Sequence, residues 1–124
     1  MTVVRCPAKH LNTVDGDTYD LLVNFKARND QRDAQVCRVR LLDYSARELR
    51  QPAEYATDGT LVRHSGADAR SIADQELRES TWIEVEFKGD DSFGRDVCWI
   101  WDESESFGAK LLARRAVIAA RQVG

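Results

Sequence analysis

Apolar and polar residues alternate through the first third of the chain with a period of two, which is typical of half-buried β-strands. The alternation is clearest at residues 18–25, where every second side chain from 19 onward is large and apolar. Shorter apolar runs lie at residues 11–14 and 36–42. The turn signal Asp-Gly-Asp at 15–17 and the polar stretch 28–33 separate the three runs. The pattern therefore predicts a three-stranded meander.

The second half of the chain predicts a helix followed by two strands. Ser65 and Asp68 have the spacing of a capping box, and apolar residues at helical spacing follow them. Alternation returns at residues 83–87 and at 96–101, with a turn signal at 88–91 between the two runs. We therefore expect a helix that begins near residue 66 and a β-hairpin after it.

A last helix is expected from about Ser106, where a helical stripe of small and apolar residues continues to Ala120. Residues 51–66 contain one proline and two glycines and show no regular period, so we predict a loop there. Three strands, a helix, two strands and a helix are the element order of the OB-fold. The sequence therefore predicts an α+β, mainly β fold: a five-stranded OB-fold barrel with a helix between strands 3 and 4 and a C-terminal helix.

Composition agrees with a globular domain, since 43% of the residues are apolar and 31% are charged. The sequence shows no internal repeat, low-complexity tract or linker, so we expect residues 1–124 to form a single domain. No apolar run is long enough to span a membrane, and the first residues do not resemble a signal peptide. The three cysteines are odd in number and far apart, which fits neither a disulfide framework nor a zinc site. These features favour a cytoplasmic protein, with a monomer as the default.

Charge limits the ways in which the chain could bind nucleic acid. Eighteen Lys and Arg against twenty-one Asp and Glu give a formal net charge of -3. Proteins that bind nucleic acid mainly by neutralising phosphates usually carry excess positive charge. Binding of nucleic acid by this chain would therefore depend on a local basic patch.

Three short segments hold the residues that could carry chemistry. Residues 14–18 place two carboxylates around a glycine turn, residues 39–48 end a strand with an arginine, an aspartate and a glutamate, and residues 92–95 form a turn with a second arginine. Carboxylate oxygens suit hard cations such as calcium or magnesium, and arginines offer permanently charged forks for a phosphate. If the segments converge, they supply what metal-assisted phosphodiester hydrolysis requires.

In this order and at this spacing, the three segments resemble the staphylococcal nuclease-like (thermonuclease) family. The family pattern runs Val-hydrophobic-Asp-Gly-Asp-Thr, then Val-Arg-Leu-Leu-Gly-Ile-Asp-Ala/Thr-Pro-Glu, then Tyr-Gly-Arg. The similarity extends to residues 83–87 and to Leu111-Leu112, and covers most of the chain from Val14 to about Val117. The resemblance implies an OB-fold nuclease that cleaves phosphodiester bonds of DNA or RNA with calcium, or with magnesium or manganese in its place.

The resemblance also implies a role for each matching residue. Asp17 would be a direct metal ligand, and Asp15 would support it. Arg40 and Arg95 would bind the phosphate and stabilise the charge that develops as water attacks. Glu48 would position or deprotonate that water.

The chain departs from the family pattern at the metal site. Ser45 stands where the family has its second metal-binding aspartate, so we expect weakened metal affinity, and Ala46 would offer only its backbone carbonyl. Asp43 lies two residues earlier on the same face of the predicted strand, and could replace the missing ligand only if the strand end shifted or a water bridged the gap. Arg47 stands in place of the family's proline and could either restore a phosphate contact or neutralise the metal site.

Two functions from different classes stay open at this point. The first is a metal-assisted nuclease, supported by the intact arginine-glutamate-arginine set. The second is a catalytically silent OB-fold module that binds protein or nucleic acid. It is supported by Ser45, by the acidic charge balance, and by Ser92 and Phe93 in place of a phosphate-binding Lys-Tyr pair.

Several other residues that can carry chemistry are better explained as structural. Cys37 and Cys98 lie within predicted strands and are expected to pack as small apolar groups. His10 and His64 have no partner at metal-ligand spacing, so we interpret both as structural or exposed. The three tryptophans at 82, 99 and 101 could stack on bases. Two of them share a stripe with Val97, which favours a place in the core or on the barrel surface.

Overall fold

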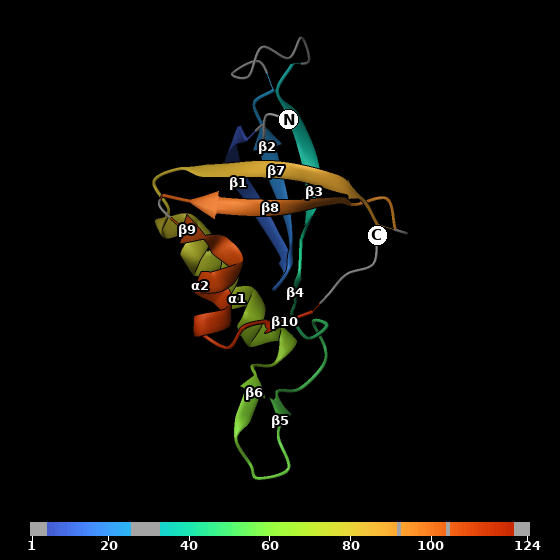
Figure 1. Ribbon diagram of the computed structural model, residues 1–124, viewed down its shortest axis with the longest axis vertical. Helices are drawn as coiled ribbons and strands as arrows, with labels where there is room; N and C mark the ends of the chain where they lie inside the picture. Colours follow the sequence, from blue (N-terminus) through green and yellow to red (C-terminus); the bar gives the residue numbers. More distant parts are fainter. Residues whose placement is uncertain (1–4, 26–32, 92, 104, 121–124) are drawn as a thin grey trace.

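A computed structural model describes residues 5–25, 33–91, 93–103 and 105–120 of the chain. Within these residues, five strands form a barrel, and the chain follows it in Figure 1 from blue to orange. The barrel strands are β1 (Cys6–Asp15), β2 (Thr18–Val23), β3 (Gln35–Leu41), β7 (Ile83–Asp90) and β8 (Asp96–Asp102).

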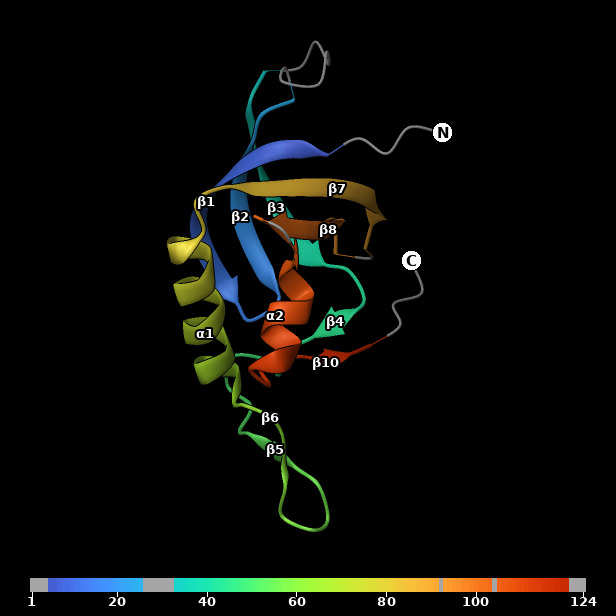
Figure 2. The same ribbon diagram turned by 60° about the vertical axis from the view of Figure 1, so that its left-hand side comes forward.

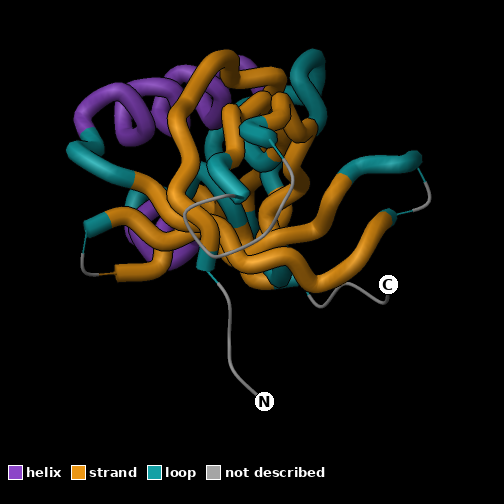
Figure 3. The backbone as a smooth tube through the Cα atoms, turned by 90° about the horizontal axis from the view of Figure 1, so that it is seen from above, coloured by secondary structure: helices purple, strands orange, loops and turns teal. Residues whose placement is uncertain are grey.

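Strand pairing closes the barrel. β1 pairs antiparallel with both β2 and β7, β2 pairs antiparallel with β3, and β7 pairs antiparallel with β8. A parallel pairing between β3 and β8 joins the two ends of this sheet. Viewed from above, the strands curve around a common centre (Figure 3), and both helices lie below β8 in Figure 1. The predicted α+β, mainly β, OB-like barrel is therefore confirmed.

Inward-facing side chains of the five strands form the core. Leu21, Val39, Val85 and Ile100 are fully buried and alternate along their strands with more exposed residues. Burying apolar side chains of this size stabilises the fold by about 1.5–3 kcal/mol each. All three cysteines are buried in the core, as expected for Cys37 and Cys98.

Helix α1 (Gly66–Glu79) begins as the sequence predicts. The Ser65 side chain accepts a hydrogen bond from the Asp68 backbone N–H, which satisfies one of the free amides at the helix start. Three apolar residues of one face are buried against the barrel: Ala69, Ala73 and Leu77. Figure 2 shows α1 running beside the β1–β2 end of the barrel. None of the helices among the described residues has the length and apolar character needed to cross a bilayer.

The predicted C-terminal helix is shorter than expected. Helix α2 begins at Phe107, after the Ser106 cap, but ends at Ala113 (α2, Phe107–Ala113). Arg115 then adopts a left-handed conformation with φ of 59°, and the N–H groups of 115 and 116 bond back to the carbonyls of 112 and 111. This Schellman motif usually contains glycine at its left-handed position, so an arginine there gave no stop signal in the sequence.

The residues after α2 return to the barrel. Strand β10 (Ile118–Ala119) pairs antiparallel with β4 (Tyr44–Ser45), the short strand that follows β3. Predicting helix over this segment was therefore wrong, because its small apolar side chains fit a buried turn and an edge strand equally well. Ala116 and Val117, which lie between α2 and β10 in the sequence, are buried.

Four further features differ from the sequence prediction. The expected loop at 51–66 contains a short hairpin, β5 (Glu54–Tyr55) and β6 (Leu61–Arg63), which projects away from the barrel in Figure 1. The first strand begins at residue 6 rather than 11. β7 continues through the predicted 88–91 turn after a register shift at residues 87–89, and a two-residue strand β9 (Glu105–Ser106) follows β8.

Candidate functional site

The three segments singled out in the sequence meet at one end of the barrel. The β1–β2 turn carries Asp15 and Asp17, and the strand register places Thr18 opposite Arg40. Arg40 in turn lies opposite Val97 in the parallel β3–β8 pair, and Arg95 precedes that strand. Barrel closure therefore brings together residues that are far apart in the sequence.

Asp17 lies at the centre of this group. Its side chain is almost fully buried and forms an ion pair with Arg40. Asp17 Oδ2 also accepts a hydrogen bond from the backbone N–H of Ala46 at 2.8 Å, and Thr18 Oγ1 donates to Oδ1 at 3.3 Å. One carboxylate thus links β2, β3 and the loop that follows β4.

The electrostatic environment of Asp17 is unusual for a carboxylate. Burial and the neighbouring Asp15 side chain raise the pKa of Asp17 to about 6, against the opposing charge of Arg40. Asp15 Oδ1 accepts a hydrogen bond from the Asp17 backbone N–H at 3.1 Å, which keeps the two carboxylates close. Asp15 and Asp17 therefore bring two carboxylates together next to one guanidinium group, that of Arg40.

Arg95 is held in place by the turn that contains it. Asp91 accepts hydrogen bonds from the backbone N–H of Arg95 at 3.0 Å and from its Nε at 2.6 Å. Arg95 Nη1 also donates to Thr18 Oγ1 at 3.2 Å, which joins this arginine to the group around Asp17. Gly94 has a positive φ of 77°, a conformation that glycine adopts without strain.

Close packing fixes the β1–β2 turn. A Cβ atom added at Gly16 would lie 2.6 Å from the Ala46 Cβ and 2.7 Å from the Ala69 Cβ. The turn is therefore pressed against both the loop after β4 and helix α1. Tyr19 adds a 2.6 Å hydrogen bond from its hydroxyl to the Gly16 carbonyl.

Glu48 has a fixed backbone and an exposed side chain. Gln51 accepts from the Glu48 backbone N–H through its Oε1 at 2.9 Å, and the Glu48 carbonyl accepts from the Gln51 N–H at 2.8 Å. The Glu48 carbonyl also packs directly on Gly66. Within the described residues, the Glu48 carboxylate forms no hydrogen bond or ion pair and is exposed to solvent, and no contact joins it to the Asp17 group.

Arg47 and Ser45 are engaged outside the Asp17 group. Arg47 Nε donates to the Pro52 carbonyl at 3.1 Å, and a phosphate contact from this residue stays a prediction. Ser45 pairs through its backbone with Ile118, and its hydroxyl lies 3.5 Å from the Ala46 carbonyl that was expected to face a metal. Neither side chain contacts Asp17.

Asp43 does not lie on an extended strand, so that part of the sequence prediction is wrong. β3 ends at Leu41, and Asp43 occupies a turn with a left-handed φ of 64°. Its carbonyl accepts a hydrogen bond from Ala120 at 2.8 Å. This reversal separates Asp43 from Ser45, because the same-face relation between them requires extended backbone.

Asp15 and Asp17 are the carboxylates that the site offers to a cation. In the part of the chain that the structure describes, no three His, Cys, Asp or Glu side chains form a group that could hold a metal ion. Calcium takes about six to eight oxygen ligands, whereas magnesium keeps several waters and is commonly bound by one or two carboxylates plus a substrate phosphate. The donor set therefore fits a hydrated cation shared with a phosphate better than calcium bound by protein alone.

Sequence reasoning missed two residues that position the site. Asp91 organises the turn that holds Arg95, and an aspartate three residues before a glycine is a recognisable turn signal. Arg63 reaches from the projecting hairpin to donate to the Ser45 carbonyl at 3.0 Å, while its Nε pairs with Glu54 at 2.9 Å. No local pattern predicts this contact, since it depends on how the hairpin folds back.

Comparison with known proteins adds no relative. No protein-family model matches this chain, and no curated protein matches it. The indications of chemistry therefore come from the site itself, in which two arginines and three carboxylates form one connected group at the end of a barrel.

Proposed function

We propose that this protein is a metal-assisted phosphodiesterase that hydrolyses DNA or RNA, in the manner of the staphylococcal nuclease-like family that its sequence resembles. The observation that carries the proposal is the chain of contacts from Arg40 through Asp17 and Thr18 to Arg95. Arg40 contacts the buried Asp17 carboxylate and Arg95 contacts the next residue, Thr18, so we expect a phosphate bound here to contact both arginines.

Each residue then has a distinct task. Arg40 and Arg95 bind the non-bridging phosphate oxygens, and their charge stabilises the transition state in which negative charge accumulates. Asp17 and Asp15 would hold a divalent cation, and that cation would supply further positive charge to the phosphate. The exposed Glu48 carboxylate orients the attacking water or accepts its proton.

The Arg40–Asp17 ion pair has a consequence for this cycle. Arg40 must give up part of its contact with Asp17 in order to bind phosphate, and a cation at Asp17 would compensate for that loss. Substrate and cation are therefore expected to bind cooperatively. Calcium, magnesium and manganese are all candidates, and the two-carboxylate donor set favours magnesium or manganese.

A second function, a catalytically silent OB-fold module that binds nucleic acid or protein, is favoured by one specific observation. Ser45 supplies no carboxylate, and Arg40 already neutralises Asp17. Such a site would bind phosphate groups through its arginines without activating water.

Cleavage of a labelled single strand separates the two functions. Wild type and the variants Arg40→Ala and Glu48→Gln are incubated with DNA or RNA in calcium, magnesium, manganese or EDTA. We expect metal-dependent cleavage by wild type and about a 100-fold loss or more in each variant, since removing one transition-state donor typically costs this much. Arg38→Ala is the matched control, because Arg38 lies two residues earlier on β3 and is paired with Asp20.

The outcome decides between hydrolysis and binding. Absence of cleavage in every metal at high protein concentration, together with Arg40-dependent binding of the same strand, would support the silent module. Equal losses in Arg40→Ala and Arg38→Ala would contradict a specific role for Arg40.

A further inference from the structure

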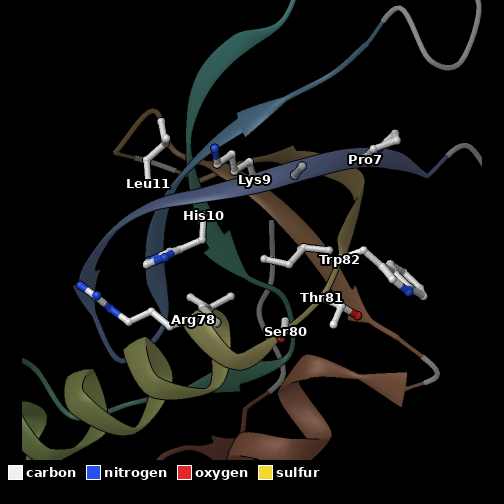
Figure 4. Close-up of a pocket in the computed structure, with 11 residues that line it drawn as sticks. Pro7, Lys9, His10, Leu11, Arg78, Ser80, Thr81 and Trp82 are labelled. Atoms are coloured by element: carbon white, nitrogen blue, oxygen red, sulfur yellow. The ribbon is translucent and has the colours of Figure 1, made fainter.

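A groove lies between strand β1 and the C-terminal end of helix α1, on the outside of the barrel. It has a volume of about 770 Å³. Residues 7–11 of β1 form one wall, and Arg78 with residues 80–83 forms the other (Figure 4). The proposed hydrolytic site uses none of these residues.

A second hollow continues this groove. It has a volume of about 330 Å³ and shares Arg78 with the first, so the two meet at that side chain. The second hollow is lined by Arg70 and reaches Leu49, the residue after Glu48. Together the two hollows extend along β1 and α1 from Trp82 to Leu49, and we refer to them as one path.

The path is positively charged although the whole chain is acidic. Lys9, Arg70 and Arg78 line it, and Asp74 is the one carboxylate among the lining residues of the two hollows. Arg78 uses its Nε to bind Asp74 at 2.7 Å, yet its side chain is 73% exposed and keeps other donors free. Burial lowers the pKa of His10, so this histidine adds no charge at neutral pH. A local excess of cations in a chain of net charge -3 favours the binding of an anionic ligand at this path.

Exposed apolar side chains lie along the same path. Trp82 is 43% exposed at one end of the groove, and Leu11 is 47% exposed on the β1 wall (Figure 4). Leu49, at the far end, is 43% exposed. Cations interleaved with an exposed indole are the features by which proteins bind single strands, since the bases stack on aromatic rings while the cations follow the backbone.

From this geometry we infer that the β1–α1 groove is a binding track for single-stranded nucleic acid, which leads the strand from Trp82 past Lys9 and Arg78 to the loop that contains Glu48 and Leu49. The inference rests on the proposed function and adds a preference for long, unpaired strands to it. An OB-fold commonly covers about 4–16 nucleotides, and the track would bind the nucleotides that lie beyond the cleaved bond.

The test measures binding of 5′-labelled oligothymidylates of 4 and 16 nucleotides by fluorescence anisotropy in EDTA. The double variant Lys9→Gln, Trp82→Ala is compared with wild type and with Lys88→Gln. Lys88→Gln makes the same change in net charge as the double variant. Lys88, however, lies on β7 five residues beyond Ile83, about 17 Å along the strand. Melting temperatures check that all three proteins are folded.

We expect the double variant to bind the 16-mer at least fivefold more weakly while the 4-mer is unaffected, because base stacking on an aromatic ring contributes at least this factor. The slope of log K against log salt concentration should fall by about 0.7 as one phosphate contact is lost. A 16-mer affinity within twofold of that of Lys88→Gln would overturn the inference. So would displacement of the 16-mer by polyglutamate at equal concentration, since that polyanion has no bases.

Cleavage of the 4-mer separates this inference from the proposed function. If no metal supports cleavage and the double variant still loses affinity for the 16-mer, the track stands and hydrolysis is wrong. If Arg40→Ala abolishes cleavage while the double variant binds the 16-mer normally, hydrolysis stands and the track is wrong.

Discussion

At the scale of single residues, Asp17 has two opposing effects. It links three parts of the site through Arg40, Thr18 and Ala46, but its buried carboxylate lies beside Asp15. Its pKa of about 6 is above the ordinary value of 3.8, so the folded protein binds this proton more tightly than the unfolded chain does. The stabilisation from Asp17 is therefore fully present below about pH 4 and is lost as the pH rises through 6.

This argument predicts a pH-dependent difference between wild type and Asp17→Asn. Without metal, wild type should lose about 1–3 kcal/mol of unfolding free energy relative to the variant between pH 4 and pH 7. Urea denaturation at several pH values in EDTA measures the unfolding free energy of both proteins. An unchanged difference across this range would contradict a raised pKa of Asp17 in the folded protein.

Ser45→Asp tests the missing carboxylate. Ser45 follows Tyr44 in β4 and precedes Ala46, whose N–H already binds Asp17, so an aspartate at this position would add charge close to that group. We expect about a tenfold gain in affinity for calcium or magnesium by titration calorimetry. Ser45→Asn is the control of equal size without the charge. Equal affinities of the two variants would mean that the site has been rebuilt around other groups.

At the scale of elements, the β1–β2 turn depends on the absence of a side chain at Gly16. An added methyl group would overlap with two buried alanines, so Gly16→Ala should lower the unfolding free energy by about 1–3 kcal/mol. Thermal unfolding measures the loss. Adding Ala46→Gly to this variant should recover part of it, because that removes one of the two clashes. No recovery in the double variant would place the strain elsewhere.

The elements that the sequence predicted well are those whose pattern is local. The five barrel strands, the Ser65 cap and the start of α2 all follow from alternation or capping residues near one another in the chain. The end of α2 and the turn at Asp43 do not follow from a local pattern. In both places a non-glycine residue adopts a left-handed conformation, and tertiary packing rather than a glycine in the sequence determines where the element ends.

In the candidate site, too, the sequence identified some features and missed others. The turn carboxylates and the two arginines could be named from sequence because their segments have a recognisable order. Their connection through Thr18 depends on strand register, and the contact of Arg63 with Ser45 depends on the projecting hairpin. Neither is encoded within a short window.

At the scale of the whole molecule, ligand binding to the site should appear as added stability. A cation at about ten times its dissociation constant would raise the unfolding free energy by about 1.4 kcal/mol, or about 3–6 °C in melting temperature for a domain of this size. We expect this shift for wild type at pH 7.5 and none for Asp17→Asn, by scanning calorimetry. An equal shift in both proteins would point to a cation site elsewhere.

The parallel contact between β3 and β8 also matters while the chain is being made. Val39 pairs with Asp96, 57 residues later, so one edge of β3 has no partner until that part of the polypeptide has left the ribosome. At about 5–20 residues per second this interval lasts about 3–11 s. An open strand edge can pair with other chains. The nascent protein is therefore most prone to aggregate after β3 has emerged and before β8 has, and slower translation of the intervening segment would extend that period.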